Sequence, residues 1–165
     1  QTYEQSYNCQ IAVDSDHQVI VAASLNNQQN DAPELPKMLA QIKRNTGRQA
    51  RELSADFGYC SEANLEEIGR RHVRGYIATG RQKHGTTTAT GHRRAPRAAE
   101  MAERLQRGGH RSRYRLRKHT VEPVFGQIKE ARGFRRFLMR GLEKVAEEWR
   151  LICAAHNLNK LFRKA

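Results

Sequence analysis

Residues 8–25, NCQIAVDSDHQVIVAASL, decide the first part of the fold. Two runs rich in Ile, Val and Ala, residues 8–13 and 18–25, flank the polar triplet at 15–17. Residues of these types favour strands, and a short polar segment between two such runs favours a tight turn. This stretch therefore predicts an antiparallel β-hairpin.

Downstream of the hairpin, helical and strand patterns alternate. Asp31 is the expected N-cap of a helix with Pro33 in its first turn, and Gly47 is expected to end that helix. Three further elements follow in order: a strand at 51–55, a helix at about 62–71 capped by Ser61, and a strand at 74–79. This alternation predicts an α/β sheet with helices packed on it.

The last third of the chain is predicted to be helical. Residues 80–97 lack apolar periodicity and are interpreted as a mobile basic loop, followed by a short helix at 98–107 that Gly108 and Gly109 break. Thr120 is the expected cap of the next helix, with Pro123 in its first turn. That helix is expected to end at Gly133 and to bury a stripe made by Val121, Val124, Phe125 and Ile128. A long helix at about 142–162 is expected to bury Val145, Trp149, Ile152, Cys153 and His156.

Positive charge is concentrated in the second half of the chain. Residues 1–80 contain 8 Lys and Arg against 10 Asp and Glu, whereas residues 81–165 contain 22 against 7. A field of one sign over half a chain indicates a polyanionic partner, most often nucleic acid. The competing explanation, that the arginines only keep helices in solution, would favour mixed signs.

Cysteine usage and hydropathy narrow the class of protein. Cys9, Cys60 and Cys153 are far apart and form no CxxC pair, so the sequence indicates neither a zinc site nor a disulfide framework. No apolar run approaches the length of a membrane helix. We interpret the cysteines as buried or half-buried thiols, which fits a reducing cytoplasm.

Two carboxylates are candidates for chemistry. Asp56 follows a predicted strand, a common place for acidic ligands in α/β enzymes, although an Asp there is more often a turn former. Glu122 lies beside the apolar stripe of its helix, with Lys129 two turns further along the same face. The simpler interpretation of Glu122 is an acid in the first turn of a solvated helix.

The charge pattern connects these acids to phosphodiester chemistry. Two magnesium ions that cut such a bond are held by several carboxylates, and a polyanionic substrate requires Lys and Arg around them. Glu122 is an isolated acid amid residues 115–118 (RLRK), Lys129, Arg132, Arg135 and Arg136.

Five segments, which follow one another along the chain, resemble those of a known protein family. They are YNCQIAVDSDHQVIVAASLNNQQND (7–31), ADFGYCSEANLEE (55–67), GYIATGRQKHG (75–85), YRLRKHTVEPVFGQIKEARGFRRF (114–137) and AAHNLNKL (154–161). The chain resembles the insertion-sequence DDE transposases, whose catalytic domain has a ribonuclease H-like fold. The resemblance implies an α/β, ribonuclease H-like mixed sheet flanked by helices, with a helical C-terminal third, forming one partial domain over residues 1–165 with a basic insertion at 80–113.

The resemblance assigns roles residue by residue. Asp56 matches the second catalytic aspartate of the family, and Glu122 matches its catalytic glutamate, so both are expected to hold Mg²⁺ or Mn²⁺ and to lie near each other. Lys129 matches the lysine that contacts DNA near the cut. The family's Tyr and Arg match Tyr114 and Arg117, but Lys118 has the family's spacing to Glu122, so the sequence leaves open which of the two contacts DNA. The expected DNA-binding set is Arg115, Arg117, Lys118, Lys129, Arg132, Arg135 and Arg136.

The family's first catalytic aspartate belongs to a strand that the resemblance places upstream of Gln1. Asp14 and Asp16 lie in the predicted hairpin turn, where Asp is an ordinary residue. We therefore expect the chain to be a truncated and inactive copy of a transposase whose partner is double-stranded DNA, both element ends and target. A homodimer of the full-length protein is compatible with this expectation.

Two other functions stay open at this point. A non-catalytic nucleic-acid-binding remnant would use the basic half of the chain and keep the fold without the chemistry. A basic RNA binder of the ribosomal type would leave the hairpin and the Asp56 block without a role.

Overall fold

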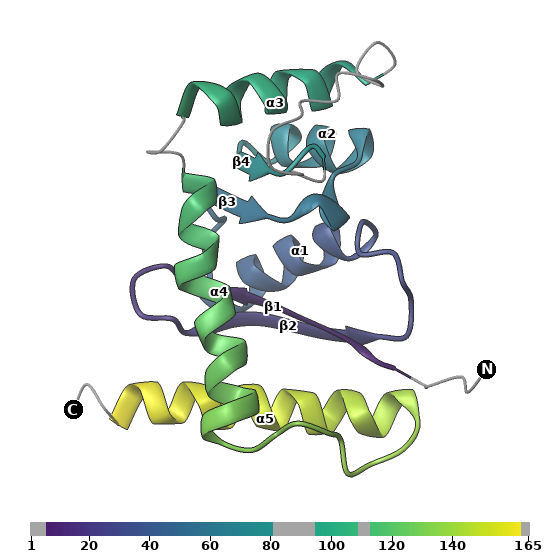
Figure 1. Cartoon of the computed structure of the whole chain (residues 1–165), viewed down its shortest axis with the longest axis vertical. Helices are drawn as coiled ribbons and strands as arrows, with labels where there is room; N and C mark the ends of the chain where they lie inside the picture. The colour runs from purple at the N-terminus through teal and green to yellow at the C-terminus, as the bar shows by residue number, and fades with distance from the viewer. Residues whose placement is uncertain (1–5, 81–94, 109–112, 163–165) are drawn as a thin grey trace. The chain divides into compact units, whose positions relative to one another are not determined.

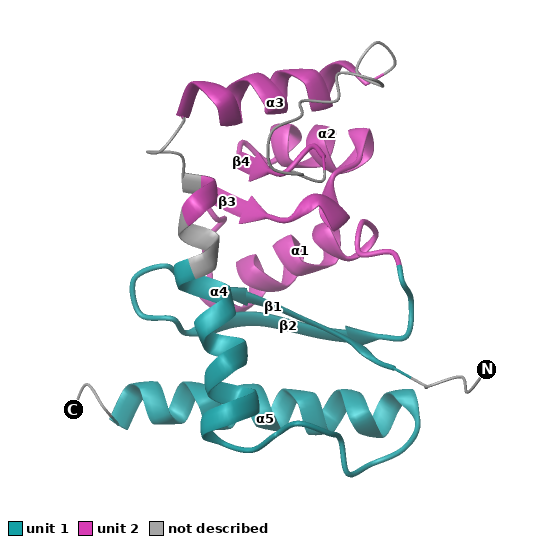
Figure 2. Cartoon of the chain, viewed as in Figure 1, with its two compact units in different colours: residues 1–29, 118–165 teal, residues 30–117 magenta. Residues whose placement is uncertain are grey.

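The computed structural model describes residues 6–80, 95–108 and 113–162. The chain divides into two compact units (Figure 2). Unit 1 contains residues 1–29 and 118–165, so it is built from both ends of the chain, and unit 2 contains residues 30–117. Among the described residues, no helix has the length and hydrophobicity needed to span a membrane.

The hairpin of unit 1 is confirmed. Strands β1 (Asn8–Val13) and β2 (Ile20–Asn26) pair antiparallel, with Ile11 opposite Ala23 and an irregularity in register at Ala12 and Val13. The Asp14 carboxylate accepts a hydrogen bond from the His17 backbone N–H at 2.9 Å, which closes the turn. Asp14 therefore has the turn-forming role that its sequence position indicated.

Three helical elements complete unit 1 (Figure 1). They are α4 (Arg117–Gly126), η5 (Gln127–Ala131), which is one turn of π-helix, and α5 (Leu142–Phe162). The predicted long helix and its buried face are confirmed, since Val145, Trp149, Ile152, Cys153 and His156 are all buried. Val124 and Ile128 meet Ile20 of β2 and the buried face of α5 in one core cluster. Burying each large apolar side chain contributes about 1.5–3 kcal/mol to the free energy of unfolding, so this cluster stabilises unit 1.

The predicted start of the Glu122 helix was wrong. The helix begins at Arg117 and not after Thr120, so Pro123 lies inside α4. A proline has no N–H to donate to the carbonyl four residues earlier, which here belongs to His119. The side-chain amide of Gln18 donates to that carbonyl at 3.1 Å. A contact from the hairpin turn thus satisfies the acceptor that Pro123 leaves open, and Glu122 lies in the middle of a helix.

Unit 2 alternates helices and strands as expected. Its elements are α1 (Glu34–Thr46), β3 (Glu52–Ala55), η1 (Phe57–Tyr59), α2 (Glu62–Arg70), β4 (Arg74–Ile77), α3 (Pro96–Gly108) and η4 (Arg113–Leu116). Strands β3 and β4 pair in parallel, with Leu53 opposite Gly75. Gly47 ends α1 in a left-handed conformation, with φ of 70°, as predicted.

The prediction that Asp31 caps α1 was wrong. The N-cap is Pro33, which makes no side-chain capping bond, and Asp31 acts through its backbone carbonyl, which accepts from Glu34 N–H at 3.0 Å. The cap of α2 is confirmed, because the Ser61 side chain accepts from Asn64 N–H at 3.1 Å. A proline followed by a local turn starts α1 without a polar side-chain cap.

The fold is therefore mixed α/β, with five α-helices among the described residues and a long C-terminal helix. The described strands form two separate two-stranded sheets and not the one sheet that the alternation suggested. The predicted basic loop falls mainly on residues 81–94, and the predicted break at Gly109 falls on residues 109–112. Both segments lie outside the described residues.

Candidate catalytic and DNA-binding residues

Asp56 is the first residue after β3, as expected. Its neighbour Ala55 is buried at the end of the strand, and the chain then turns through η1. Asp56 itself is half-buried, and its Oδ1 atom is shielded from solvent. The residue thus occupies the carboxyl end of a parallel strand, where α/β proteins often bind ligands.

Two other acids share the surroundings of Asp56. Burial raises the pKa of Tyr59 above its usual value, and the negative charges of Asp31, Asp56 and Glu34 raise it further. Glu34 is buried and accepts a hydrogen bond from Lys37 Nζ at 2.7 Å. The end of β3 and the start of α1 therefore form a negatively charged region in a chain that is positive as a whole.

The turn before α1 and the turn after β3 lie close together and are joined by side-chain contacts. A Cβ atom at Gly58 would lie 2.6 Å from Asp31 Oδ2, so glycine is the residue that lets the two turns approach. The buried Asn64 side chain donates to the carbonyls of Ala32 and Tyr59, at 2.8 and 2.9 Å. The sequence pattern did not predict that Asp31, Glu34 and Asn64 surround Tyr59 together with Asp56. The available signal was Asn64, a helix-disfavouring residue inside the predicted helix that Ser61 caps.

Glu122 lies on α4 in unit 1 with an exposed side chain. Val124, two residues later, is fully buried, and so is Ile128. The helix therefore buries one face in the core of unit 1 and presents the carboxylate of Glu122 on another. The simpler interpretation, an acid in the first turn of a helix, is wrong because Glu122 is the sixth residue of α4.

Lys129 is exposed on η5, one element beyond Glu122. Its Nζ lies 5.7 Å from the centroid of the Phe125 ring, a cation–π contact. Phe125 stacks in turn on Trp149, with ring centroids 6.1 Å apart. The aromatic pair therefore supports the lysine stem while the charge stays accessible to an anion.

The other predicted DNA-binding residues lie in α4 or are close to α4 and η5 in the sequence. Arg115 is exposed in η4 of unit 2, and Arg117 and Lys118 begin α4, although their side chains lie outside the described set. Arg132 is half-buried after η5, and Arg135 pairs with Glu130. Arg136 is exposed. Arg115 and Arg117 belong to unit 2 and Lys118 to unit 1. The other four, Lys129, Arg132, Arg135 and Arg136, also belong to unit 1 and follow one another along 129–136.

Asp56 belongs to unit 2 and Glu122 to unit 1, so the expectation that they hold metal together stays a prediction. Within the described ranges, no three His, Cys, Asp or Glu side chains are grouped as a metal site. In their donor chemistry the two carboxylates suit Mg²⁺ or Mn²⁺, which prefer hard oxygen ligands.

The three cysteines and His156 are packed against the rest of the chain, as predicted. All three cysteines are free and are buried or half-buried. Burial raises the pKa of Cys9 to about 11, against a smaller opposing effect of the Lys129 charge, and raises that of Cys153 to about 12. Both thiols are therefore protonated at neutral pH and are poor nucleophiles. His156 is fully buried, with Nε2 3.0 Å from the Gln18 carbonyl oxygen.

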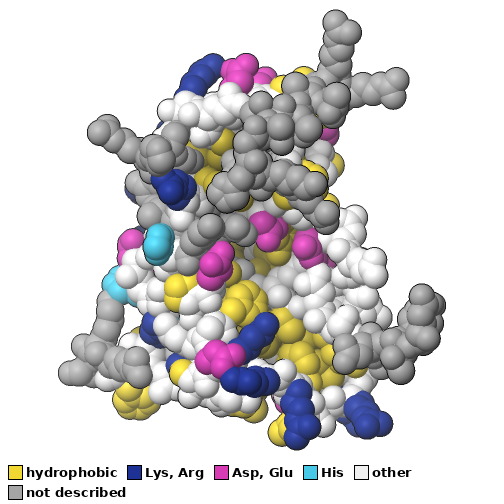
Figure 3. All heavy atoms as spheres, viewed as in Figure 1, with side chains coloured by type: hydrophobic (Ala, Val, Ile, Leu, Met, Phe, Trp, Pro, Cys, Tyr) yellow, Lys and Arg dark blue, Asp and Glu magenta, His cyan; other side chains and the backbone are white. Residues whose placement is uncertain are grey.

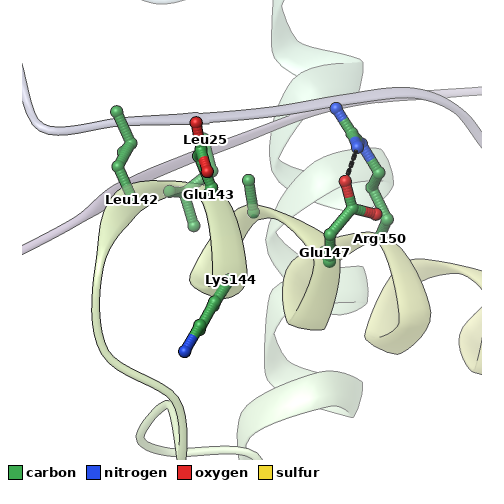
Figure 4. A pocket seen from close by; sticks show the side chains of 7 residues that line it. Leu25, Leu142, Glu143, Lys144, Glu147 and Arg150 are labelled. Atoms are coloured by element: carbon green, nitrogen blue, oxygen red, sulfur yellow. Dashed lines mark hydrogen bonds and ion pairs between the residues drawn. The ribbon is translucent and has the colours of Figure 1, made fainter.

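A surface pocket lies in unit 1 where the start of α5 passes Leu25 of β2 (Figure 4). Its other lining residues come from α5: Leu142, Glu143, Lys144, Ala146, Glu147 and Arg150. The two long charged side chains at its far end, Glu147 and Arg150, form an ion pair with each other. The pocket contains none of the predicted site residues.

A family model described as a transposase DDE domain matches residues 78–162. The match runs from just after β4 to the end of α5, so it contains Glu122 and Lys129, and it begins after Asp56. No curated protein and no solved structure matches the chain. Because the matched residues are more than half of its length, the chain belongs to the transposase DDE domain family, whose members act in DNA transposition.

Proposed function

We propose that this chain is the part of a DDE transposase catalytic domain that contributes Asp56 and Glu122 to metal-dependent cleavage and strand transfer of DNA ends. The observation that carries the proposal is the family match across α4, η5 and α5. In this region Glu122 is exposed while its helix is anchored by buried Val124. A rigid helix that presents one carboxylate to solvent is suited to a catalytic ligand.

DDE transposases generally use a divalent metal ion. Asp56 and Glu122 would hold Mg²⁺ or Mn²⁺, because both provide carboxylate oxygens. When bound, two such ions would activate the attacking oxygen and stabilise the leaving oxygen at a phosphodiester. The protein's own share is to place the two carboxylates and to keep basic side chains around them.

The DNA partner is supported by charge as well as by family. Lys129, which makes a cation–π contact with Phe125, is suited to bind a phosphate close to Glu122. The further phosphate contacts in this proposal are Arg115, Arg117 or Lys118, Arg132, Arg135 and Arg136. Such contacts position a duplex without reading its sequence.

A ribonuclease H-like architecture is part of the proposal. The order of an antiparallel hairpin, a helix, a strand, a helix and a parallel strand supports it. Residues 1–165 would then be one catalytic domain with a basic insertion at 80–113, and a further strand that carries the first aspartate would complete its sheet. Without that third carboxylate, residues 1–165 would be inactive by themselves.

Manganese binding by the 165-residue chain tests the roles of the two carboxylates. Water-proton relaxation measures bound Mn²⁺ in the parent chain and in Asp56→Asn and Glu122→Gln. We expect each substitution to weaken Mn²⁺ binding by about tenfold, since each removes one charged ligand. Glu66→Gln and Glu143→Gln, which neutralise acids elsewhere in the two units, are the matched controls and should leave binding unchanged. Equal binding by all five proteins would contradict the catalytic roles and favour a non-catalytic DNA-binding remnant.

A further inference from the structure

The segment between η5 and α5, residues 132–141, combines exposed apolar and basic side chains. We call it the 132–141 connection. Its sequence is RGFRRFLMRG. Leu138 is 82% exposed and Met139 is 51% exposed, although they are adjacent large apolar residues. Arg136 precedes this pair and Arg140 follows it, and both are exposed.

Single exposed leucines are common on protein surfaces, so exposure alone decides nothing. The backbone beneath the pair provides the second observation. The Glu148 carboxylate of α5 accepts hydrogen bonds from Leu138 N–H at 2.9 and 3.1 Å, and from Met139 N–H at 3.0 Å. The backbone is thus held to α5 at the position where the two apolar side chains point to solvent.

An aromatic anchor fixes the same segment from the other side. Phe137 is half-buried and packs edge-on against Trp149, with centroids 6.4 Å apart. Gly133 and Gly141 delimit the connection with positive φ values of 73° and 88°. The chain therefore turns sharply at both ends, buries Phe137, and leaves the next two apolar residues outside.

Exposed apolar residues that are flanked by arginines are suited to one kind of partner, a DNA duplex. Proteins that bend DNA insert Leu, Met, Ile or Phe between base pairs, and they hold the flanking phosphates with basic side chains. In the view of Figure 3, basic and apolar side chains lie next to each other over α5 and the segment that leads into it. A protein partner would suit the apolar pair, but the surrounding arginines favour a polyanion.

We propose that the 132–141 connection is a DNA wedge, in which Leu138 and Met139 insert at a base-pair step while Arg136 and Arg140 contact the phosphates beside it. This inference rests on the proposed DNA partner and adds an action on the duplex, namely local unstacking. The step would be a flexible pyrimidine–purine step, because unstacking costs least there. Glu148 is a positioning residue in this account, since it touches the backbone of the wedge and not the DNA.

Fluorescence of 2-aminopurine tests the wedge directly. The probe is a duplex with 2-aminopurine in place of adenine at several TA steps, since the base brightens when it unstacks. We expect the 165-residue chain to raise the fluorescence by about twofold or more. The double variant Leu138→Ala/Met139→Ala should lose this rise but keep the same salt dependence of DNA binding by anisotropy. The matched control Leu151→Ala/Leu158→Ala, which truncates two exposed leucines of α5, should keep the rise.

The remaining variants distinguish insertion of the wedge from electrostatic attraction between the chain and DNA. Arg136→Ala/Arg140→Ala should lower the log–log salt slope by about 2, because two phosphate contacts are lost. Glu148→Gln should reduce the rise while changing that slope little. DNA binding without a rise by the parent chain, or a rise that survives in Leu138→Ala/Met139→Ala, would overturn the wedge and leave the proposed function intact. A chain that bound no DNA at all would overturn the proposed function as well.

Discussion

The side-chain amide of Gln18 donates a hydrogen bond to the carbonyl of His119 at 3.1 Å, and this acceptor is the one that Pro123 leaves open in α4. The same amide group accepts from Lys160 Nζ at 2.9 Å through its oxygen, and the Gln18 backbone carbonyl accepts from His156. One residue of the hairpin turn therefore bonds to both α4 and α5. In this way the hairpin helps to position the helix that carries Glu122.

Replacing Gln18 should destabilise the chain measurably. Gln18→Ala removes the donor to His119 and the acceptor for Lys160, and we expect the free energy of unfolding to fall by about 1–2 kcal/mol. Urea denaturation measures the change, with Gln29→Ala as the matched control at an exposed position of the following loop. In a Pro123→Ala background the same substitution should cost less, by about 0.5 kcal/mol or more, because a restored N–H serves the His119 carbonyl. Equal costs in both backgrounds would show that the proline and Gln18 are not coupled.

Stability should depend on pH through His156. Burial lowers its pKa below 6.5, the Gln18 carbonyl opposes this effect, and the charges of Arg132 and Lys160 add to it. The unfolded chain then binds the proton more readily than the folded one. This contribution to stability is fully present above pH 6.5 and is lost as the pH falls from 6.5 towards the folded-state pKa.

Urea midpoints across that pH range check the contribution of His156. His156→Gln should flatten the dependence, whereas the exposed control His119→Gln, which keeps its backbone acceptor, should not. A parent chain with the same pH dependence as His156→Gln would contradict the assignment. The slope is the quantity to compare, because His156→Gln also changes packing in the core.

DNA affinity should fall steeply with salt, with little sequence preference, and the segment 81–136 should supply most of it. Changing Arg115, Arg117 and Lys118 together to Ala should flatten the log–log slope by about 2 to 3 units, near 0.9 per lost phosphate contact. Fluorescence anisotropy over a salt series measures the slope. The triple variant Lys43→Ala/Arg44→Ala/Arg48→Ala removes the same charge near the end of α1 and should leave it unchanged. Equal slopes in the parent and the first triple variant would place the DNA surface elsewhere.

The sequence predicted most local structure, and long-range contacts explain where it did not. The hairpin, the Gly47 and Ser61 boundaries and the buried face of α5 follow from residue type and spacing, which act over a few residues. The start of α4 was missed because a proline normally marks a first turn. Here Gln18, more than 100 residues away in sequence, satisfies the acceptor that makes an internal proline costly.

The candidate site was predictable to a similar extent. Asp56 at a strand end and Glu122 beside an apolar stripe could be found from pattern alone, and the family match now covers Glu122. The clustering of Asp31 and Glu34 with Asp56 could not be predicted, because it depends on how two turns meet at Gly58. The exposure of Leu138 and Met139 could not be predicted either, because it depends on the contact of their backbone with Glu148 of α5.

The 165-residue chain should be catalytically inert by itself. In the proposed function Asp56 and Glu122 supply two of three catalytic carboxylates, and a two-metal site needs a further bridging ligand. Nicking and strand-transfer assays with Mg²⁺ or Mn²⁺, on DNA that carries the element's own ends, should give no product above the Glu122→Ala control. Metal-dependent product that disappears in Glu122→Ala would mean that another carboxylate, with Asp14 the first candidate, replaces the bridging ligand.

Iron-directed cleavage of the chain tests whether Asp56 and Glu122 bind one metal site together, as proposed. Fe²⁺ takes the place of Mg²⁺, and ascorbate with hydrogen peroxide then generates radicals that cut the backbone beside the bound ion. We expect cuts next to both Asp56 and Glu122. Excess Mg²⁺ should suppress them, and either Asp56→Asn or Glu122→Gln should abolish the cuts at both positions. Cuts beside only one of the two residues, or cuts at one that persist when the other is neutralised, would contradict the shared site.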